Sequence, residues 1–325
     1  MSAQLQELDR QIGLGTFPLS GVFTPVTHDD AQAVVTRFFE AGGRYVETAP
    51  IYPRTEVCLA RILAQFPRDA YMVGTKCVLS PGPDGNPITS GRPEVIHDQC
   101  LQELQRLGLE YIDILEAHVT PTDVPLAEVT GALSALREEG LVRYIGASNA
   151  SRADVAEYLK GGPLDIIQNR YSIIHRNPTE EITKACQDSD IVFNPYQVIE
   201  RGQLIDISST AGSWGPNDLR ASKAEYVGDA FERIHKWVVT ELSSIATAAD
   251  LSMASLSIRW TLSKPQVRIP VVGATKIWQI DSNLAGGTDP LPADVLSAVD
   301  QAYERFSDQI RSLFGLSVEE FRGLA

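Results

Sequence analysis

The chain has 325 residues, of which 43% are hydrophobic and 22% are charged, a composition typical of a globular protein with a large core. Its 42 Asp and Glu residues outnumber its 28 Lys and Arg residues. The net charge of −14 would repel nucleic acids and anionic membranes, so we expect neither as a partner. The start of the chain has no signal-peptide pattern, and the cysteines lack paired spacing. We therefore expect a cytoplasmic protein with four free thiols, at Cys58, Cys77, Cys100 and Cys186.

Short β-rich runs alternate with amphipathic helical runs along the chain. In the first unit, residues 12–16 form the expected strand, and Thr27 with Asp30 predicts a capping box for a helix that ends near Gly42. The same pattern predicts eight strands, at residues 12–16, 44–48, 71–75, 111–117, 142–147, 164–168, 191–193 and 268–272. The later helices are expected at residues 57–66, 94–107, 126–136, 151–159, 179–186, 230–262 with a break near 251, and 277–284.

Eight alternating strand–helix units predict an α/β fold, specifically a (β/α)8 TIM barrel, because strands separated by helices pair in parallel through right-handed crossovers. We expect a single domain over residues 1–325, with the barrel at about 11–288 and a C-terminal tail at 289–325. A doubly wound sheet is the alternative, but Gly13-Leu-Gly15-Thr-Phe-Pro lacks the third glycine of a GxGxxG motif. The tail and the long loop 205–228 should lie near one barrel face, and the Gly/Pro-rich run 81–91 is interpreted as a mobile loop.

Ionisable residues follow the ends of three neighbouring strands. Glu47 follows the second strand, Lys76 the third and His118 the fourth, and Tyr52 lies in the loop after Glu47. The carboxyl ends of barrel strands carry the active site, so these side chains can converge. A lysine beside a tyrosine lowers the pKa of the phenol, a carboxylate holds the lysine charged, and a histidine can orient a carbonyl oxygen. The set suits carbonyl reduction, although each residue taken singly also fits a role in packing or ion pairing.

A helix that begins just after the eighth strand carries three polar residues on one face. Lys276, Gln279 and Asn283 lie three and seven residues apart, which places them on the same side of a helix. A helix N-terminus attracts anions through its free N–H groups and its dipole, and a lysine in the first turn adds a charge suited to a 2′-phosphate. The pattern predicts a phosphate site, and a solvated helix end capped by Thr275 is the alternative.

Several motifs, in the same order along the chain, resemble those of the aldo-keto reductase family. Glu47-Thr-Ala-Pro-Ile-Tyr52 followed by Arg54-Thr-Glu56 resembles Asp-Thr-Ala-x-x-Tyr-Gly-x-Ser-Glu. Leu141-Val-Arg-Tyr-Ile-Gly-Ala-Ser-Asn149 resembles Lys-Val-Arg-x-Ile-Gly-x-Ser-Asn, and Gln168-Asn-Arg-Tyr-Ser172 resembles Gln-x-x-Tyr-Ser/Asn. The resemblance runs from residue 12 to about residue 284. It implies that Tyr52 is the general acid, that Lys76 lowers its pKa, and that His118 orients the carbonyl.

The resemblance also implies a nicotinamide cofactor. Gly273-Ala-Thr-Lys276 with Gln279 and Asn283 is similar to the form found in family members that bind NADPH, so NADPH (NADP+) is expected, with NADH as the alternative. Ser148, Asn149 and Gln168 would hold the carboxamide and Tyr196 would stack on the ring. The other cofactor contacts implied in this way are Gln197, Val198, Ile199, Gly202, Gly273 and Thr275.

The chain departs from the family pattern at three places. Glu47 stands where the family has aspartate, and its extra methylene moves the carboxylate relative to Lys76. Pro53 replaces a glycine, and Tyr196-Gln-Val-Ile-Glu-Arg replaces an aromatic-Ser-Pro-Leu run. The protein is therefore expected to be a divergent member.

An apolar pocket above the four ionisable residues would favour a small-molecule aldehyde or ketone with an apolar or aromatic part. Trp214 in the long loop would either line this pocket or pack the loop against the barrel. The expected substrate contacts are Phe17, Ile51, Val119 and Trp214.

Two other functions remain open. The first is an NADP(H)-binding regulatory or redox-sensing protein with little turnover, which Glu47 favours and the presence of Tyr52, Lys76 and His118 disfavours. The second is an aldolase that forms a Schiff base on Lys76. A metal site is not expected, because none of the five histidines pair at the i, i+4 spacing of a zinc helix. We expect a monomer or a small homo-oligomer.

Overall fold

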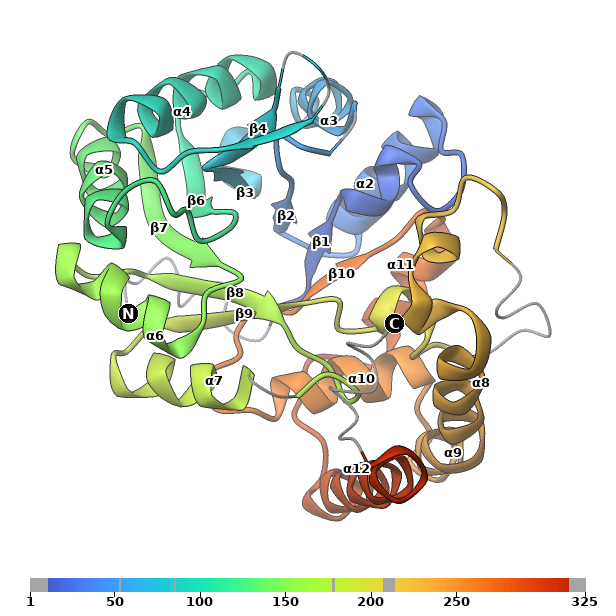
Figure 1. The fold of residues 1–325 in the computed structure, drawn as a ribbon. Coiled ribbons are helices and arrows are strands. Elements are labelled where there is room, and N and C mark those ends of the chain that lie inside the picture. The colour runs from blue at the N-terminus through green and yellow to red at the C-terminus, as the bar shows by residue number, and fades with distance from the viewer. Residues whose placement is uncertain are drawn as a thin grey trace.

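The computed structural model describes residues 11–52, 54–82, 84, 86–176, 179–206 and 214–315. Eight parallel strands form one sheet in the order β10-β1-β2-β3-β6-β7-β8-β9 (Figure 1). The sheet closes between its two edges, because Phe193 pairs in parallel with Val267 and its N–H donates to the carbonyl of Gln266 at 3.0 Å. The strands are β1 (Gly13–Gly15), β2 (Tyr45–Glu47), β3 (Met72–Cys77), β6 (Ile112–Ala117), β7 (Val142–Ser148), β8 (Ile166–Arg170), β9 (Val192–Tyr196) and β10 (Val271–Gly273).

Helices surround the strands, so the predicted (β/α)8 barrel is confirmed and the doubly wound alternative is wrong (Figure 1). The predicted capping box of Thr27 with Asp30 is present, and Ser151 with Asp154 forms a second one. The helices are α2 (His28–Glu40), α3 (Thr55–Leu63), α4 (Pro93–Leu107), α5 (Leu126–Glu138), α6 (Arg152–Tyr158), α7 (Thr179–Asp188), α8 (Gly228–Trp237), α9 (Ser243–Ala248), α10 (Met253–Leu262), α11 (Ile277–Ala285) and α12 (Ala293–Phe314). None of the described helices has the length and apolar composition that a membrane crossing requires.

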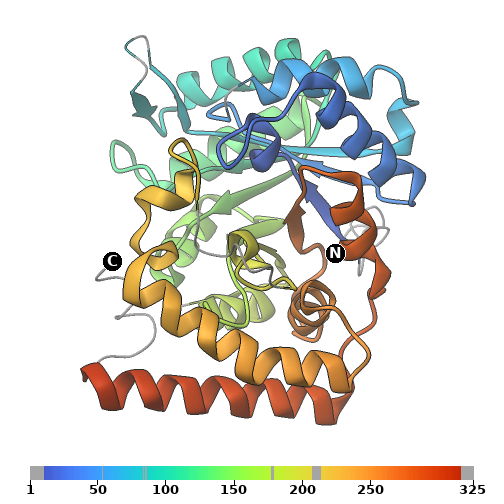
Figure 2. The same ribbon diagram turned by 90° about the vertical axis from the view of Figure 1, so that its right-hand side faces the viewer.

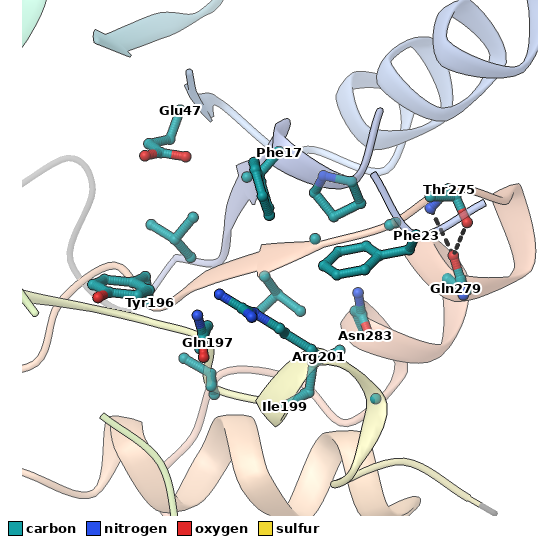
Figure 3. Close-up of a pocket in the computed structure, with 18 of the residues that line it drawn as sticks. Phe17, Phe23, Glu47, Tyr196, Gln197, Ile199, Arg201, Thr275, Gln279 and Asn283 are labelled. Atoms are coloured by element: carbon teal, nitrogen blue, oxygen red, sulfur yellow. Dashed lines mark hydrogen bonds between the residues drawn. The ribbon is translucent and has the colours of Figure 1, made fainter. Parts of the chain in front are cut away.

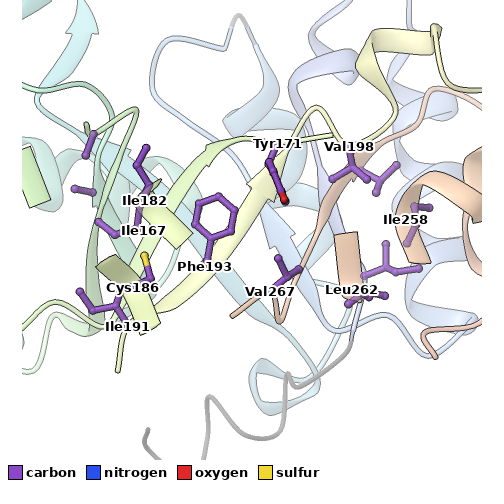
Figure 4. Packing of buried hydrophobic residues seen from close by; sticks show 14 of the residues in the cluster. Ile167, Tyr171, Ile182, Cys186, Ile191, Phe193, Val198, Ile258, Leu262 and Val267 are labelled. Atoms are coloured by element: carbon purple, nitrogen blue, oxygen red, sulfur yellow. The ribbon is translucent and has the colours of Figure 1, made fainter. Parts of the chain in front are cut away.

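The core has an inner and an outer layer because strand side chains alternate between the barrel interior and the helices. The inner layer fills the interior of the barrel with Tyr45, Ile114, Tyr144, Ile166 and their neighbours. Gly74 on β3 makes room for Tyr45, since a Cβ at Gly74 would overlap the tyrosine hydroxyl. The outer layer includes Ile167, Ile182, Cys186, Phe193 and Val267 (Figure 4). This packing fixes the strand ends that carry the site.

Two segments differ from the expectations. The run 81–91, interpreted as a mobile loop, contributes to an antiparallel hairpin of β4 (Leu79–Pro81) and β5 (Pro87–Thr89). The high Gly and Pro content of the run hid this strand pairing from the sequence analysis. Residues 83 and 85 lie outside the described part. The tail holds the long helix α12, which runs beside α8 and α9 rather than over the strand ends (Figure 2). The rings of Trp237 and Phe306 stack at 4.5 Å, and Asp300 accepts hydrogen bonds from Arg176 at 2.8 Å and from Trp260 at 3.2 Å.

The predicted break near residue 251 is confirmed between α9 and α10. The stretch before it is further divided by one π-helical segment, Val238–Leu242, between α8 and α9. The four cysteines are free, and three of them are buried.

Candidate active site

A pocket of about 570 Å³ opens at the carboxyl ends of the strands. It brings together residues of all eight βα units, from β1 to the start of α11. Of the residues predicted from the sequence, it is lined by Phe17, Glu47, Ile51, Tyr52, Lys76, His118, Ser148, Asn149, Gln168, Tyr196, Gln197, Val198, Ile199, Gly202, Gly273, Thr275, Gln279 and Asn283.

One carboxylate oxygen joins the tyrosine and the lysine. Oε1 of Glu47 accepts a hydrogen bond from the Tyr52 hydroxyl at 3.5 Å and also pairs with the ammonium of Lys76. Lys76 is almost fully buried, and its Nζ also donates to the carbonyl of Thr48 at 3.3 Å. The structure records no direct contact between Tyr52 and Lys76 among the described residues, so Glu47 lies between the two groups.

The pKa of Tyr52 differs from the expectation. We expected Lys76 to lower it, but burial raises it well above its ordinary value, Tyr196 and Glu116 add to the rise, and Arg201 opposes it. The reason is geometric, because Lys76 is engaged by carboxylates and does not contact the phenol. Tyr52 is therefore protonated in the open pocket.

His118 is a neutral side chain. Burial, followed by the charge of Lys76, lowers its pKa to about 3. Its Nδ1 is buried with no hydrogen-bond partner among the described residues, and its ring meets the ring of Tyr52 edge-on at 6.1 Å. A neutral imidazole has one N–H to donate, which suits it to orient an uncharged carbonyl oxygen.

Sequence reasoning missed Glu116 on β6. It is fully buried, and its Oε2 lies 3.9 Å from Nζ of Lys76. The signal was present, since residues two apart in a strand share a face, and Glu116 lies two residues after the inward-facing Ile114 in a strand that is otherwise mostly apolar.

Polar side chains at the ends of β7, β8 and β9 surround the middle of the pocket. The Tyr196 hydroxyl donates to Oδ1 of Asn149 at 2.6 Å, and Nδ2 of Asn149 donates to the carbonyl of His118 at 2.9 Å. Asn149 has a φ of 58°, a left-handed conformation that asparagine tolerates better than most residues. Nε2 of Gln168 is buried and has no partner among the described residues. This amide could donate to a ligand amide.

Arg201 was also missed. Its guanidinium projects into the pocket near Gln197 and Asn283 (Figure 3), and it has no ion-pair partner among the described residues. Its φ of 49° is in the left-handed region, where non-glycine residues need support from their surroundings. The support comes from the preceding Glu200, which is fully buried and accepts a hydrogen bond from Ser172 at 2.6 Å while pairing with Arg170. Local sequence does not reveal such a backbone conformation.

The start of α11 presents backbone and side-chain donors to the pocket. Oε1 of Gln279 accepts from the backbone N–H of Thr275 at 2.7 Å (Figure 3) and from the backbone N–H of Lys276 at 3.1 Å. Lys276 itself does not line the pocket, because its Nζ pairs with Asp30 of α2 at 2.9 Å. The predicted phosphate lysine is thus engaged by a carboxylate at the pocket's edge.

Two predicted substrate contacts lie outside the pocket lining. Val119 packs against the outer core. Trp214 donates to the carbonyl of Tyr226 at 2.7 Å, and its ring lies 3.8 Å from the guanidinium carbon of Arg220. Of its two predicted roles, Trp214 therefore has the second, which is to pack the long loop rather than to line the pocket. Arg220 of the same loop lines the pocket instead. Residues 207–213 of that loop and Pro53 lie outside the described residues.

A family model, Aldo/keto reductase family, matches residues 11–304. The chain belongs to the aldo-keto reductase family. This aldo-keto reductase is 30% identical to an NADH-specific methylglyoxal reductase of Escherichia coli (strain K12), over 85% of this chain and 89% of the relative. It is 25% identical to the aldo-keto reductase yakc [NADP(+)] of Schizosaccharomyces pombe, over 84% of this chain and 82% of that one.

A solved glycerol dehydrogenase of Gluconobacter oxydans has the same fold as this aldo-keto reductase, with a TM-score of 0.80 and 24% identity over 91% of each chain. An aldo-keto reductase of Bacillus halodurans, solved in its holo form, has a TM-score of 0.72 and 22% identity over 90% of this chain and 91% of that one. Aldo-keto reductases are oxidoreductases that use nicotinamide cofactors, and this membership accounts for the predicted motifs.

Proposed function

We propose that this aldo-keto reductase reduces an aldehyde or ketone to an alcohol, with Tyr52 as the general acid. The observation that carries the proposal is the meeting of Tyr52, Lys76 and His118 at one end of a pocket whose other end is the start of α11. A bound nicotinamide cofactor supplies the hydride. The residues of the chain bind and orient the carbonyl and provide the proton.

The proton comes from the Tyr52 hydroxyl, which is protonated because burial raises its pKa. In the open pocket this hydroxyl has Glu47 as its acceptor at a long 3.5 Å, a weak hydrogen bond that a substrate oxygen can replace. Neutral His118 would donate its N–H to the same oxygen, and the charge of Lys76 would stabilise the negative charge that Tyr52 gains.

The residues of the pocket fit a nicotinamide dinucleotide. The unpartnered buried amide of Gln168 would donate to the carboxamide, with Ser148 and Asn149 beside it, and Tyr196 would stack on the ring. Gln197, Val198, Ile199 and Gly202 would follow the pyrophosphate, and the cation of Arg201 would face it. Gly273, Thr275, Gln279 and Asn283 would hold the adenosine end at the start of α11, where the helix dipole favours anions.

NADPH is the cofactor we propose, with NADH as the alternative. Lys276 lies next to the pocket at the start of α11, but its ammonium is shared with Asp30 at 2.9 Å. Binding a 2′-phosphate requires Lys276 to turn from Asp30, whereas NADH makes no such demand. The names of the relatives also include both cofactors, since one relative is named as NADH-specific and the name of another carries NADP(+).

A small carbonyl compound is the proposed substrate, because Phe17, Phe23, Ile51 and Leu79 give the pocket an apolar side. The name of the Escherichia coli relative makes methylglyoxal a suitable first test compound. Turnover of NADPH and NADH would be measured by absorbance with methylglyoxal and with aromatic and aliphatic aldehydes, for the wild type and for Tyr52→Phe. Turnover that Tyr52→Phe abolishes supports the proposal; binding of cofactor without turnover in either protein contradicts it.

A second candidate, a cofactor-binding sensor with little turnover, rests on Glu47, whose Oε1 contacts both Tyr52 and Lys76. The assay above separates the two candidates. The aldolase alternative is disfavoured, because Lys76 is almost fully buried and pairs closely with the carboxylate of Glu47, which favours its charged, non-nucleophilic form.

We further infer that the chain forms one domain and that the protein works in a reducing compartment such as the cytoplasm. Eight of the described strands form one closed sheet, α12 packs against α9 outside it, and the four thiols are unpaired. Expression of tagged protein followed by thiol labelling in cells tests the compartment.

A further inference from the structure

Glu116 is a buried carboxylate that the proposed mechanism does not use. It pairs in register with Lys76 on β3 and with Gly146 on β7, so it faces the barrel interior directly beside the lysine. Its Oε2 lies 3.9 Å from Nζ of Lys76, and neither of its oxygens has a hydrogen-bond partner among the described residues.

The charges around Glu116 do not balance if every carboxylate is ionised. Among the residues that the structure describes, Lys76 is the single buried cation beside the two carboxylates of Glu47 and Glu116. An unpaired charge in a protein interior is costly, and a carboxyl group avoids that cost by holding a proton. Glu47 has Lys76 and Tyr52 as partners, whereas Glu116 has a distant Lys76 alone. Glu116 is therefore the group that keeps the proton.

Other titratable groups near Glu116 do not supply the missing positive charge. Three neighbours interact electrostatically with Glu116: Tyr45 on β2, Tyr52 in the loop after β2, and Cys77 on β3. Burial raises the pKa of each of these groups, so all three are neutral. His118 on the same strand is neutral because its pKa is lowered. On the other side β7 presents Gly146, which has no side chain.

We propose that Glu116 is a positioning residue that carries a proton while Tyr52 acts as the acid, and that loss of this proton to solvent weakens Tyr52 as a donor. The inference rests on the proposed function. With Glu116 neutral, Lys76 has one carboxylate to balance and the rest of its field reaches the phenolate that forms. With Glu116 ionised, a second negative charge opposes that phenolate.

The direction of the pKa shifts agrees with this geometry. Burial raises the pKa of Glu116 above its ordinary value, with Lys76 opposing the rise, and burial lowers the pKa of Lys76. Ionised Glu116 also raises the pKa of Tyr52. The rate of carbonyl reduction should therefore fall as Glu116 loses its proton with rising pH.

The first test is the infrared spectrum of the full-length protein, which does not depend on turnover. We expect the wild type to have, near pH 6, a carbonyl stretch of a protonated carboxyl group that Glu116→Gln lacks and that disappears as the pH rises. Because burial also raises the pKa of Glu56 to about 9, the band of Glu116 is taken from the difference between the two spectra. Asp113→Asn is the matched control, because Asp113 is a buried carboxylate on the same strand that is paired with Arg68 at 2.6 Å and Arg143 at 3.1 Å. This control should retain the band.

The second test is the pH profile of hydride transfer in single turnovers with methylglyoxal. The wild-type rate should fall at high pH, and Glu116→Gln should exceed it by about threefold or more at pH 9 while differing little at pH 6. Glu116→Asp, which keeps a carboxyl group, should restore the fall, and it provides the comparison if Glu116→Gln does not fold.

Protonated carboxyl bands that are the same in the wild type and in Glu116→Gln from pH 5 to pH 9 would overturn this inference and leave the role of Tyr52 intact. Identical pH profiles for the wild type and Glu116→Gln would also overturn it. Absence of turnover in the wild type as well as in every variant, together with a normal band, would count against the proposed function instead, so the two failures are distinguishable.

Discussion

Tyr52 and Lys76 meet through a single atom, Oε1 of Glu47, which lies 3.5 Å from the tyrosine hydroxyl and contacts the lysine ammonium. The longer side chain of glutamate, compared with the aspartate expected from the family pattern, allows this position. The arrangement has a cost for catalysis, because a carboxylate beside a phenol disfavours the phenolate that proton donation produces.

Shortening this carboxylate should therefore raise the rate. Glu47→Asp withdraws the oxygen from Tyr52 but keeps a negative charge for Lys76, and we expect hydride transfer to rise by about threefold or more. Glu47→Gln keeps the length but removes the charge that balances Lys76, so it should slow hydride transfer by about tenfold. Stopped-flow measurements on both variants check this pair. A slower Glu47→Asp would show that the glutamate contact assists the reaction.

Cofactor selection should depend on the pair of Asp30 and Lys276. Asp30→Asn frees the lysine, and because exposed ion pairs are weak, we expect NADPH to bind only about two- to fivefold more tightly. Lys276→Met should weaken NADPH binding by about tenfold. Neither change should alter NADH binding much. Fluorescence titrations of both nucleotides provide the measurement, and equal effects on NADH and NADPH would contradict the role of Lys276.

Burial of His118 should make the protein sensitive to acid. Its pKa is lowered from 6.5 to about 3 in the folded state, so below pH 6.5 the unfolded chain binds a proton that the folded chain excludes. Stability should fall by up to about 1.4 kcal/mol per pH unit from pH 6.5 towards pH 3 through this group. His118→Asn should show a shallower fall in urea unfolding over this range. Parallel curves for the two proteins would refute the assignment.

Helix α12 should matter for stability and not for catalysis. Asp300 accepts from both Arg176, which is buried, and Trp260, so Asp300→Ala should cost about 1–3 kcal/mol by leaving those donors unpaired. Asp308→Ala removes an exposed pair with Arg311 and should change stability by less than about 0.5 kcal/mol. Urea unfolding and turnover, measured on both variants, test the difference. An equal loss in the two would deny Asp300 this role.

The order of strands and helices could be predicted because the alternation of short apolar runs and capped helices is local in the sequence. The four residues Glu47, Tyr52, Lys76 and His118 could be placed for the same reason, since each follows a predictable strand end. The ion pair between Lys276 and Asp30 could not be predicted, because 246 residues separate the two side chains along the chain. The orientation of Arg201 depends on a left-handed backbone that the buried Glu200 supports, which no local pattern reveals.

The role of Tyr52 as proton donor is tested most directly by single-turnover hydride transfer with cofactor already bound to the wild type and to Tyr52→Phe. Phenylalanine keeps the ring that packs on Phe17 at 4.9 Å and removes the hydroxyl alone, so cofactor binding should be unchanged. We predict a fall in the rate of about 100-fold or more. Equal rates in the two proteins, with cofactor bound in both, would contradict the account.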